Sequence, residues 1–385
     1  ASRFQTGLLR STKNAPNAPA PDFGTSEGRR GSSVMHDVSL LSIATAVPEN
    51  IVEQSKVESL AASVFPDLFN RYPVMMDIFR NSGIERRHTV RPLEWYLEPR
   101  DWTDRSKVFH EDGLALFERV AKEAIARAKI APDEIDCVVT ICSSGVATPS
   151  LEARAAENLG LRADVRRVPV FGLGCAGGVS GLSLAARLAS VKADTAVLVV
   201  VIELCSLAFR IDRGTKEDAV ASALFGDGAA AIVLRANEHE GLAQIHGSAE
   251  HMWPDTTDVM GWIFDPIGFG VVLSRSVPIF VERRFPPVAK KLLAAVGLTN
   301  EDVGRYVCHP GGGKVVDAVE MALKLKRGSL DHERDVLREF GNMSAPTILF
   351  ALERVLRAPR KGMLALSALG PGFTASLLAI DPAHA

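Results

Sequence analysis

The sequence predicts an α/β fold made of two similar halves. Three observations support this: amphipathic helical stretches alternate with short runs of β-branched residues, one such run is apolar throughout, and two Gly-x-Gly turns each precede a strand of small residues. At 385 residues, of which 47% are hydrophobic, the chain can bury the core that such a fold needs.

The predicted elements follow an N-terminal leader. Residues 1–34 are rich in Ser, Gly, Pro, Ala, Asn and Arg and show no apolar period, so we expect a flexible tail there. The first strand is expected at Val38–Ala46, which alternates as a strand does. The elements expected after it are a helix at Asp112–Lys129, a strand at Cys137–Cys142, a helix at Leu151–Leu159, a strand at Val168–Phe171, a helix at Val179–Lys192 and a strand at Ala196–Ile202.

The two halves are predicted from a weak internal repeat. The segments GDGAAAIVL, from Gly226, and GPGFTASLLAI, from Gly370, both join a Gly-x-Gly turn to a strand of small residues. Each segment closes one half of the chain, and we place the halves at residues 35–235 and 236–385. A glycine-led helix precedes each strand, so the starts of these two helices are expected to meet at a pseudo-twofold axis. The apolar run Ala196–Ile202 is expected to be buried on both faces.

Composition restricts the partners and the compartment. Lys and Arg number 44 against 46 Asp and Glu, so the net charge of −2 gives no general electrostatic reason to expect nucleic acid or an anionic membrane. A small anionic ligand is compatible with this net charge. The longest apolar stretch is far shorter than the roughly 20 residues of a membrane helix, and no span is expected. The five cysteines lack the paired spacing of zinc or disulfide frameworks, which favours a reducing, cytoplasmic setting.

Cys175 is the candidate nucleophile. It lies in FGLGCAGGVSGLSLAARLA, where glycines surround it between a predicted strand and an amphipathic helix. The positive end of a helix dipole and free N–H groups would lower the pKa of such a thiol and raise its thiolate fraction. Neighbouring glycines would leave room for a thioester. The alternative is a buried cysteine beside a tight turn.

Two further residues have the chemistry to assist Cys175. His309, in YVCHPGGGKVVDAVE, follows a short strand and precedes a glycine loop, where it can accept a thiol proton or donate to a carbonyl. Asn342, in FGNMSAPTILFALERVL, offers a neutral amide donor. Imidazole and carboxamide together can stabilise the enolate of a decarboxylating malonyl thioester without a metal, so no cofactor is needed. The alternatives are a structural loop histidine and an ordinary helix N-cap.

These segments, in this order and spacing, resemble the type III polyketide synthases of the chalcone synthase superfamily. The resemblance rests on the glycine-rich Cys175 segment, CHPGGGKVVDAVE and GNMSAPTILFALE, and it extends over about residues 38–382 through ICSSGVATPSLEARAAENLGL, ALFGDGAAAIVL and LGPGFTASLL. It implies a thiolase-like five-layered αβαβα fold, a homodimer and a CoA tunnel. It also implies that a starter acyl-CoA acylates Cys175, while His309 and Asn342 promote decarboxylation of malonyl-CoA. Repeated extension would end in cyclisation to a pyrone, resorcinol or phloroglucinol-type product.

The resemblance also assigns the residues of the substrate cavity. Phe225 aligns with the aromatic gatekeeper between tunnel and cavity. Where plant members place a second aromatic residue, this chain has Val271, which would widen or reshape the passage and suit a bulkier or long aliphatic starter. The other positions that the alignment places on the cavity wall are Ser144, Cys205, Ala208, Trp262 and Ser344.

The phosphates of CoA need cations or free N–H groups at the tunnel mouth. Lys314 lies by a helix start after a glycine loop that includes Gly312, where free N–H groups favour an anion. The other cations that are candidates by position are Arg71, Arg80, Arg86 and Arg87. Two rival functions remain: a single-round ketoacyl synthase that releases a linear product, and a non-catalytic acyl-CoA-binding homologue.

Overall fold

A computed structural model of the chain describes residues 35–358 and 361–382, so the predicted leader at residues 1–34 lies outside the described residues. The strands of the main sheet are β1 (Val38–Ala46), β4 (Ile135–Cys142), β5 (Arg166–Phe171), β6 (Ala196–Leu204), β7 (Asp227–Ala236), β8 (Ala243–Met252), β11 (Val303–Cys308), β12 (Met363–Gly370) and β13 (Thr374–Pro382). Two small antiparallel pairs are β2 (Asn50–Glu53) with β3 (Arg86–Thr89), and β9 (Met260–Asp265) with β10 (Gly268–Leu273). The helices are α1 (Gln54–Val64), α2 (Pro66–Arg71), α3 (Asp77–Arg80), α4 (Trp102–Val108), α5 (Leu114–Ala128), α6 (Leu151–Leu159), α7 (Gly177–Ser190), α8 (Lys216–Leu224), α9 (Val277–Ala295), α10 (Gly313–Ala322), α11 (Asp331–Phe340) and α12 (Thr347–Arg357).

The main sheet is built from two halves with the same strand arrangement. Its order is β11-β12-β13-β8-β1-β7-β6-β4-β5. In the N-terminal half, β4 runs parallel to β6, β6 is antiparallel to β7, and β7 is antiparallel to β1; β5 adds one further parallel strand beside β4. In the C-terminal half, β11 runs parallel to β12, and β12, β13 and β8 repeat the antiparallel arrangement. The two halves meet where β1 pairs with β8 through Ser39 and Leu40. This correspondence is the internal repeat that the sequence predicted.

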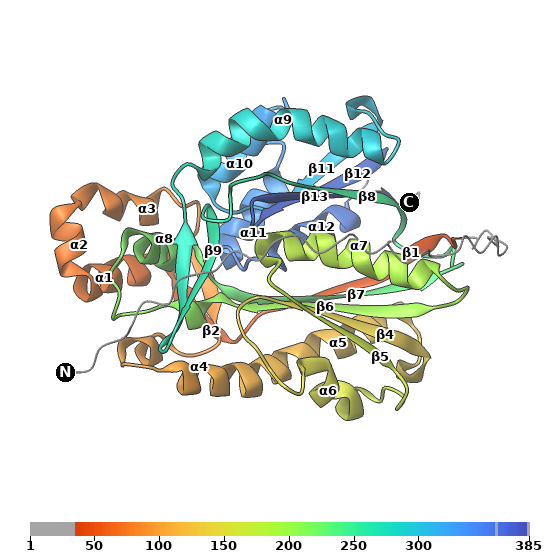
Figure 1. The fold of residues 1–385 in the computed structure, drawn as a ribbon, viewed down its shortest axis with the longest axis horizontal. Helices are drawn as coiled ribbons and strands as arrows, with labels where there is room; N and C mark the ends of the chain where they lie inside the picture. The colour runs from red at the N-terminus through yellow and green to blue at the C-terminus, as the bar shows by residue number, and fades with distance from the viewer. Residues whose placement is uncertain (1–34, 359–360, 383–385) are drawn as a thin grey trace, which may run out of the picture. The chain divides into compact units, whose positions relative to one another are not determined.

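The elements of residues 35–382 stack in five layers, as Figure 1 shows. Helices α5 and α6 cover the outer face of the N-terminal half of the sheet, α7 and α12 fill the middle, and α9 and α10 cover the C-terminal half. The apolar cores between the layers include Leu198 and Phe117 on one side of β6 and Val199 and Leu182 on the other. The predicted αβαβα order is therefore confirmed.

The predicted elements of the N-terminal half are found close to their expected bounds. Strand β6 is buried along its whole length, as its apolar sequence predicted. Strand β1 and helix α6 have the bounds that were expected. The helix expected to start at Asp112 begins instead with one π turn, Phe109–Gly113, which leads into α5.

Glycines allow the two halves to meet closely at the start of α7. A Cβ atom on Gly178 would lie 2.4 Å from the carbonyl oxygen of Ala345, and one on Gly177 would lie 2.7 Å from the Ile141 side chain. Distances this short exclude any side chain at either position. The bare backbone of α7 therefore packs against the segment that leads into α12, which brings Cys175 and Asn342 to the same side of the molecule.

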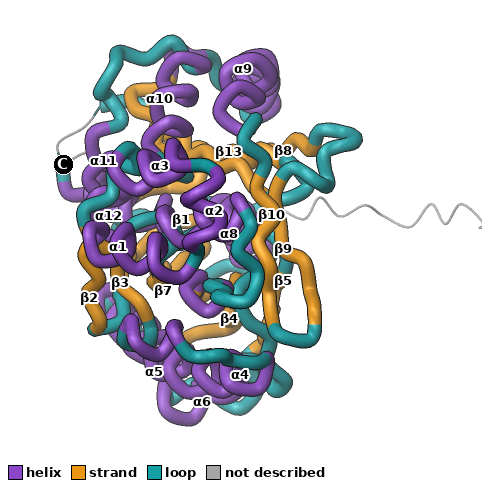
Figure 2. The backbone as a smooth tube through the Cα atoms, turned by 90° about the vertical axis from the view of Figure 1, so that its left-hand side faces the viewer, coloured by secondary structure: helices purple, strands orange, loops and turns teal. Residues whose placement is uncertain are grey.

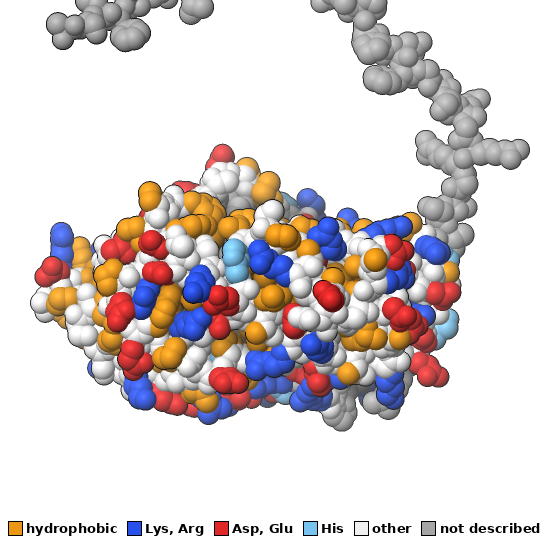
Figure 3. Space-filling view, turned by 90° about the horizontal axis from the view of Figure 1, so that it is seen from below, with side chains coloured by type: hydrophobic (Ala, Val, Ile, Leu, Met, Phe, Trp, Pro, Cys, Tyr) orange, Lys and Arg blue, Asp and Glu red, His pale blue; other side chains and the backbone are white. Residues whose placement is uncertain are grey.

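Elements outside the main sheet surround the mouth of the site. Helices α1, α2, α3 and α8 pack together around Phe65, Phe69 and Phe79, and the β9–β10 hairpin lies beside α8 (Figure 2). On the face below α4, α5 and α6, acidic and basic side chains are interspersed (Figure 3), in line with the balanced charge. Within the described parts of the chain, no helix combines the length and the apolar character needed to cross a membrane.

Candidate active site

Cys175, His309 and Asn342 open into one cavity of about 540 Å³. Its wall is contributed by strands β11 and β12, by the turn that holds Cys175, by the β9–β10 hairpin and by the loops that precede α10 and α12. Cys175 precedes His309 by more than 130 positions in the sequence, yet the pseudo-twofold packing places all three residues around a common space. We therefore treat this cavity as the candidate active site.

Cys175 sits in a tight backbone turn at the start of α7. It is the middle residue of the 3₁₀ turn Gly174–Ala176, which runs directly into the helix. Gly174 has a φ of +48° and packs against Pro371, where a Cβ atom would lie 2.6 Å from the ring. The half-buried thiol lies 3.5 Å from the Ser344 hydroxyl, within reach of a sulfur hydrogen bond. The turn thus presents the sulfur to the cavity.

The expected lowering of the Cys175 pKa is not found. Burial raises the pKa of the thiol to about 11, the contact with Ser344 opposes the rise, and the Glu203 carboxylate adds to it. Removal of the sulfur from water therefore outweighs the favourable position at the helix start. At neutral pH the thiol is protonated, so attack on a thioester requires a base.

His309 can be that base because the described residues leave its ring free of hydrogen bonds. It directly follows β11, and its backbone N–H donates to the Ser367 carbonyl at 2.9 Å. The side chain is buried, and neither ring nitrogen has a hydrogen-bond partner among the described residues. Burial lowers the pKa of the imidazole to about 4. The ring is thus neutral, with one nitrogen able to accept a proton and the other able to donate one.

Asn342 is held from both its backbone and its side chain. Its backbone N–H donates to the Leu224 carbonyl at 2.8 Å, and its own carbonyl accepts from the Gly226 N–H at 3.0 Å. Its amide nitrogen donates to the Gly311 carbonyl at 3.0 Å, and its amide oxygen accepts from the Ser344 N–H. Because Gly311 is two residues from His309, this bond ties the two candidate donors together. Helix α12 begins only at Thr347, so the N-cap alternative is excluded.

Ser344 was expected on the cavity wall and lies there beside the nucleophile. Its φ of +60° is a left-handed conformation that non-glycine residues rarely adopt. The hydrogen bond from its N–H to Asn342 and the bonds that Thr347 donates to its carbonyl hold this conformation. Unusual backbone conformations of this kind concentrate at functional sites.

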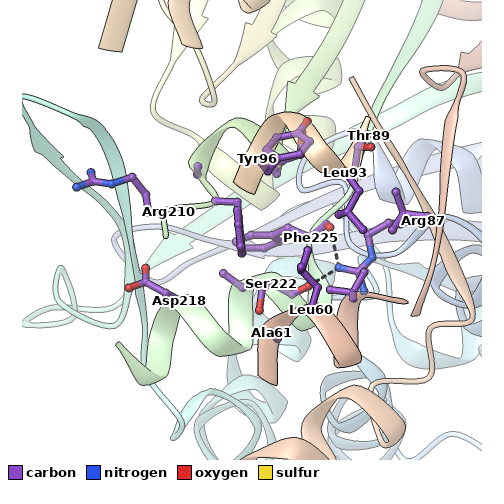
Figure 4. A pocket seen from close by; sticks show the side chains of 17 residues that line it. Leu60, Ala61, Arg87, Thr89, Leu93, Tyr96, Arg210, Asp218, Ser222 and Phe225 are labelled. Carbon is purple, nitrogen blue, oxygen red and sulfur yellow. Dashed lines mark hydrogen bonds between the residues drawn. The ribbon is translucent and has the colours of Figure 1, made fainter. Parts of the chain in front are cut away.

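The remaining predicted cavity residues divide into three groups. Phe225, Val271, Trp262 and Cys205 line the catalytic cavity. Ala208 lines a smaller, mainly apolar pocket of about 60 Å³, which shares Cys205 and Phe225 with the catalytic cavity (Figure 4). Ser144 lines neither: it is buried, and its hydroxyl accepts a hydrogen bond from the Leu204 N–H at 2.8 Å. The expectation that Ser144 contacts substrate is therefore wrong.

A buried carboxylate beneath the site was missed. Glu203, at the end of β6, accepts from the Ser143 N–H at 3.0 and 3.1 Å, and the Ser143 hydroxyl accepts from the Gly174 N–H next to Cys175. Burial raises the pKa of Glu203 to about 7. The signal for it in the sequence is a single acidic residue in an otherwise apolar strand, VLVVVIEL.

Only some of the cations predicted to bind CoA line the catalytic cavity. Lys314 and Gly312 line the catalytic cavity, and so does the exposed Arg275, which the sequence reasoning missed. The exposed Arg71, Arg80 and Arg86 are not on its wall; Arg71 packs over the Tyr72 ring and Arg80 pairs with Glu58. The assignment of Arg87 is wrong.

Arg87 is 2% exposed and serves the interior of the protein. Its guanidinium donates to Gln54 and to the carbonyls of Ser222, Ala223 and Phe225. In strand β3 successive side chains point to opposite sides, so Arg86 faces solvent while Arg87 faces the core. A buried guanidinium whose two terminal nitrogens donate to protein groups cannot bind a phosphate at a tunnel mouth.

Comparison with known proteins agrees with this geometry. Residues 25–238 match the family model for the N-terminal domain of chalcone and stilbene synthases, and residues 244–380 match the model for their C-terminal domain. A 1,3,6,8-tetrahydroxynaphthalene synthase of Streptomyces peucetius subsp. caesius is 37% identical over 359 residues, which cover 91% of this chain and 95% of that protein. An alpha-pyrone synthesis polyketide synthase-like protein of Mycobacterium tuberculosis is 28% identical over 88% of this chain and 90% of its own length.

Solved structures give the same result. The crystal structure of the 1,3,6,8-tetrahydroxynaphthalene synthase of Streptomyces coelicolor A3(2), described as a bacterial type III polyketide synthase, has a TM-score of 0.86 at 26% sequence identity. The likeness covers 90% of this chain and 100% of that one. The resemblance seen in the sequence therefore extends to the complete fold of residues 35–382.

Proposed function

The chain belongs to the chalcone and stilbene synthase family, and from this premise we propose that it condenses malonyl-CoA repeatedly onto an aliphatic acyl-CoA starter held on Cys175. Type III polyketide synthases are malonyl-CoA-dependent acyltransferases with a thiolase-like fold, and this protein is one of them. The observation that carries the proposal for this chain is the convergence of Cys175, His309 and Asn342 on one cavity, with the His309 ring unpaired.

Loading of the starter begins with the neutral thiol. His309 accepts the Cys175 proton as the sulfur attacks the carbonyl carbon of the starter thioester. The tetrahedral intermediate then collapses, the C–S bond to CoA breaks, and the imidazolium returns the proton to the departing CoA thiolate. The products are an acyl-Cys175 thioester, free CoA and a neutral His309. The ring's lack of another partner leaves it available for both proton transfers.

Extension uses His309 and Asn342 as donors. The thioester carbonyl oxygen of malonyl-CoA accepts hydrogen bonds from the His309 ring N–H and from the second N–H of the Asn342 amide, whose first N–H is engaged by Gly311. Loss of carbon dioxide leaves an enolate whose negative oxygen these donors stabilise. The enolate carbon attacks the acyl-Cys175 carbonyl, the C–S bond to Cys175 breaks, and the thiolate is free to recapture the longer chain. This chemistry needs no cofactor beyond the CoA thioesters.

Lys314 and Arg275 bind the phosphates of CoA. Both line the cavity, and Lys314 is the second residue of α10, whose dipole favours an anion at this end. Asp77 is the acidic residue on the same wall, so the two cations give this wall a net positive charge.

The starter is aliphatic because the space near Cys175 is largely apolar. The pocket behind Phe225 is formed mainly by apolar side chains, among them Leu60, Ala61 and Leu93. An alkyl tail that reached this pocket would leave water without losing hydrogen bonds. The product is a pyrone, resorcinol or phloroglucinol-type compound, and the name of the relative from M. tuberculosis favours the pyrone.

The protein assembles as a homodimer through the open edge of its sheet. Strand β5 ends the sheet, so one side of it has no strand partner among the described residues. Phe171 at its end is 45% exposed and contacts Phe264 of the hairpin, which is 58% exposed, and Val146 is also exposed. Natural proteins seldom leave such an apolar edge uncovered. Sedimentation equilibrium should give twice the chain mass, and a monomer at micromolar concentration would contradict the proposal.

The compartment proposed is the cytoplasm. The described cysteines, Cys137, Cys142, Cys175, Cys205 and Cys308, are all free. Free thiols, one of them the nucleophile, persist in a reducing environment.

The deciding experiment is a panel of starter-CoA thioesters with radiolabelled malonyl-CoA, read by product mass. We expect cyclised products, with aliphatic starters preferred over p-coumaroyl-CoA. Linear β-keto products alone would instead support a single-round ketoacyl synthase. The product named for the S. peucetius relative is 1,3,6,8-tetrahydroxynaphthalene; its formation by this protein when malonyl-CoA is the only substrate supplied would contradict the aliphatic starter.

A further inference from the structure

The residue opposite Val271 in the hairpin changes what the small valine side chain indicates about the width of the passage. In the β9–β10 hairpin, Val271 is the direct cross-strand partner of Trp262. Directly opposite side chains share one face of a strand pair, with Cβ atoms about 4.5–5.5 Å apart. Both residues line the catalytic cavity. The space that an aromatic ring at position 271 would fill is thus next to an indole that comes from the other strand.

Trp262 contacts the gatekeeper ring directly. Its ring centroid lies 6.1 Å from that of Phe225, at an interplanar angle of 62°, which is an edge-to-face contact. Behind it, Trp262 packs on Phe269 at 5.7 Å, and Phe269 packs on Trp102 at 5.0 Å. The indole is therefore wedged between the body of the hairpin and Phe225.

Phe225 itself separates two spaces. It lines both the catalytic cavity and the apolar side pocket, at whose centre Figure 4 shows it. Its backbone is fixed, because its carbonyl accepts from Arg87 at 3.0 Å and the residue forms a β-bridge with Asn342. Only the ring can move, and the contact of the ring with Trp262 limits that movement.

We propose that Trp262, and not the residue at position 271, sets the passage between the catalytic cavity and the side pocket by bracing the Phe225 ring. Val271 is small because the opposite indole occupies the room that a ring at 271 would need. The inference rests on the proposed aliphatic starter, whose tail has to pass Phe225 and Cys205 to reach the side pocket.

The test measures acylation of Cys175 alone, by intact-protein mass, with saturated acyl-CoA starters from acetyl to lauroyl and without malonyl-CoA. Trp262→Ala should shift the optimum to longer chains and raise the relative rate for the longest starter about tenfold, the change expected for a methylene or two in an apolar site. Trp262→Phe, which keeps a ring, should move the optimum less. Because this assay involves no extension, it measures starter selectivity even if the polyketide reaction fails. The polyketide reaction is tested separately, by product formation with malonyl-CoA.

A reciprocal exchange makes the test specific. Val271→Phe should slow acylation by all but the shortest starters, because two rings then compete for one space. The double variant Trp262→Ala/Val271→Phe should return towards the wild-type profile, so the two effects are not additive. Additive effects, or an unchanged chain-length optimum in Trp262→Ala, would overturn the inference.

Two matched variants exclude a general loosening of the hairpin. Ile263→Ala changes the next residue of β9, and Ile267→Ala changes the turn between β9 and β10; both residues are exposed and neither lines the cavity. Both should keep the wild-type chain-length optimum. The same shift in either of them would assign selectivity to hairpin stability and contradict the role of Trp262. Circular dichroism of each variant confirms that the fold is retained.

Discussion

The floor of the catalytic cavity and its hairpin wall are held in different ways. On the floor, Cys175 sits in a 3₁₀ turn that runs into α7, and Asn342 is fixed by backbone and side-chain hydrogen bonds on both sides. On the wall, Trp262 belongs to a two-stranded hairpin outside the main sheet and is placed by contacts between rings. The reacting groups are thus positioned by the backbone, while the shape of the substrate space depends on packing that one substitution can change.

The largest loss of activity is expected for a substitution on the floor of the catalytic cavity. Cys175→Ala removes the proposed nucleophile, and we expect both acyl-enzyme and product to fall by a factor on the order of 10⁴ or more. Cys137→Ala, which changes a buried core cysteine of β4, should keep substantial activity. Intact mass after incubation with acyl-CoA and product mass after malonyl-CoA measure the two steps. Full malonyl-dependent product formation by Cys175→Ala would refute the mechanism.

Asn342→Ala should separate the two steps on the floor. Loss of one donor to a developing oxyanion typically lowers a rate about 10²–10³-fold, so decarboxylation of malonyl-CoA should fall by this factor. Acylation of Cys175 by the starter needs His309 rather than Asn342 and should change much less. Release of labelled carbon dioxide measures the first step and intact mass the second. Equal losses in both would indicate a structural role for Asn342.

The pH dependence should report the burial of His309. In the proposed mechanism the neutral ring accepts the thiol proton. Because burial lowers the pKa of His309 to about 4, acylation should then persist as the pH falls through 6.5 and be lost only near pH 4. At pH 4.5 this is a difference on the order of tens-fold from a histidine of ordinary pKa. Single-turnover acylation across pH measures it. An acid limb near pH 6.5 would mean that the ring is solvated in the working enzyme.

A smaller effect is expected for a substitution in the side pocket behind Phe225. Ala61→Leu should fill part of the pocket behind Phe225 and lower the rate for the longest accepted starters about tenfold, with acetyl-CoA little affected. Ala62→Leu, the next residue of α1, is exposed and serves as the matched control. Rates across the starter series measure the effect. An equal loss for every chain length would show that alkyl tails do not enter this pocket.

The smallest effect is expected for substitution of the two cations proposed to bind the phosphates of CoA. Lys314→Ala and Arg275→Ala should each raise the KM for malonyl-CoA by about fivefold, since exposed charged contacts contribute on the order of 1 kcal/mol. Malonyl pantetheine, which lacks the nucleotide phosphates, should show no change. Lys291→Ala on the exposed side of α9 is the control. Loss of affinity for both substrates alike would place these cations elsewhere than on the phosphates.

Much of the fold could be predicted because its strongest signals are local. Strand β6 is apolar at nearly every position, and α6 and β1 have a clear period, so their bounds were predicted closely. The β9–β10 hairpin was not predicted, because its strands are short and its residues do not alternate cleanly. Its position over the cavity depends on contacts with α8 that no local pattern encodes.

The candidate site divides in the same way. Cys175, His309 and Asn342 could be named because each lies in a glycine-rich segment with a family resemblance. Arg87 was misplaced and Arg275 was missed, because the exposure of an arginine depends on which side of the backbone faces the interior. The sign of the Cys175 pKa shift was wrong for a related reason, since it depends on burial more than on the helix start.

The sequence by itself determined the α/β order, the repeat and the three reactive residue types, because these follow from periodicity, glycine placement and side-chain chemistry. Only the tertiary structure decided that the His309 ring has no hydrogen-bond partner among the described residues, and that burial lowers the pKa of His309 and raises that of Cys175. It also decided that Val271 is the cross-strand partner of Trp262, whose ring contacts Phe225. The physical reason is that desolvation and cross-strand packing are properties of a residue's neighbours in space, and neighbours from distant parts of the chain exist only once it has folded.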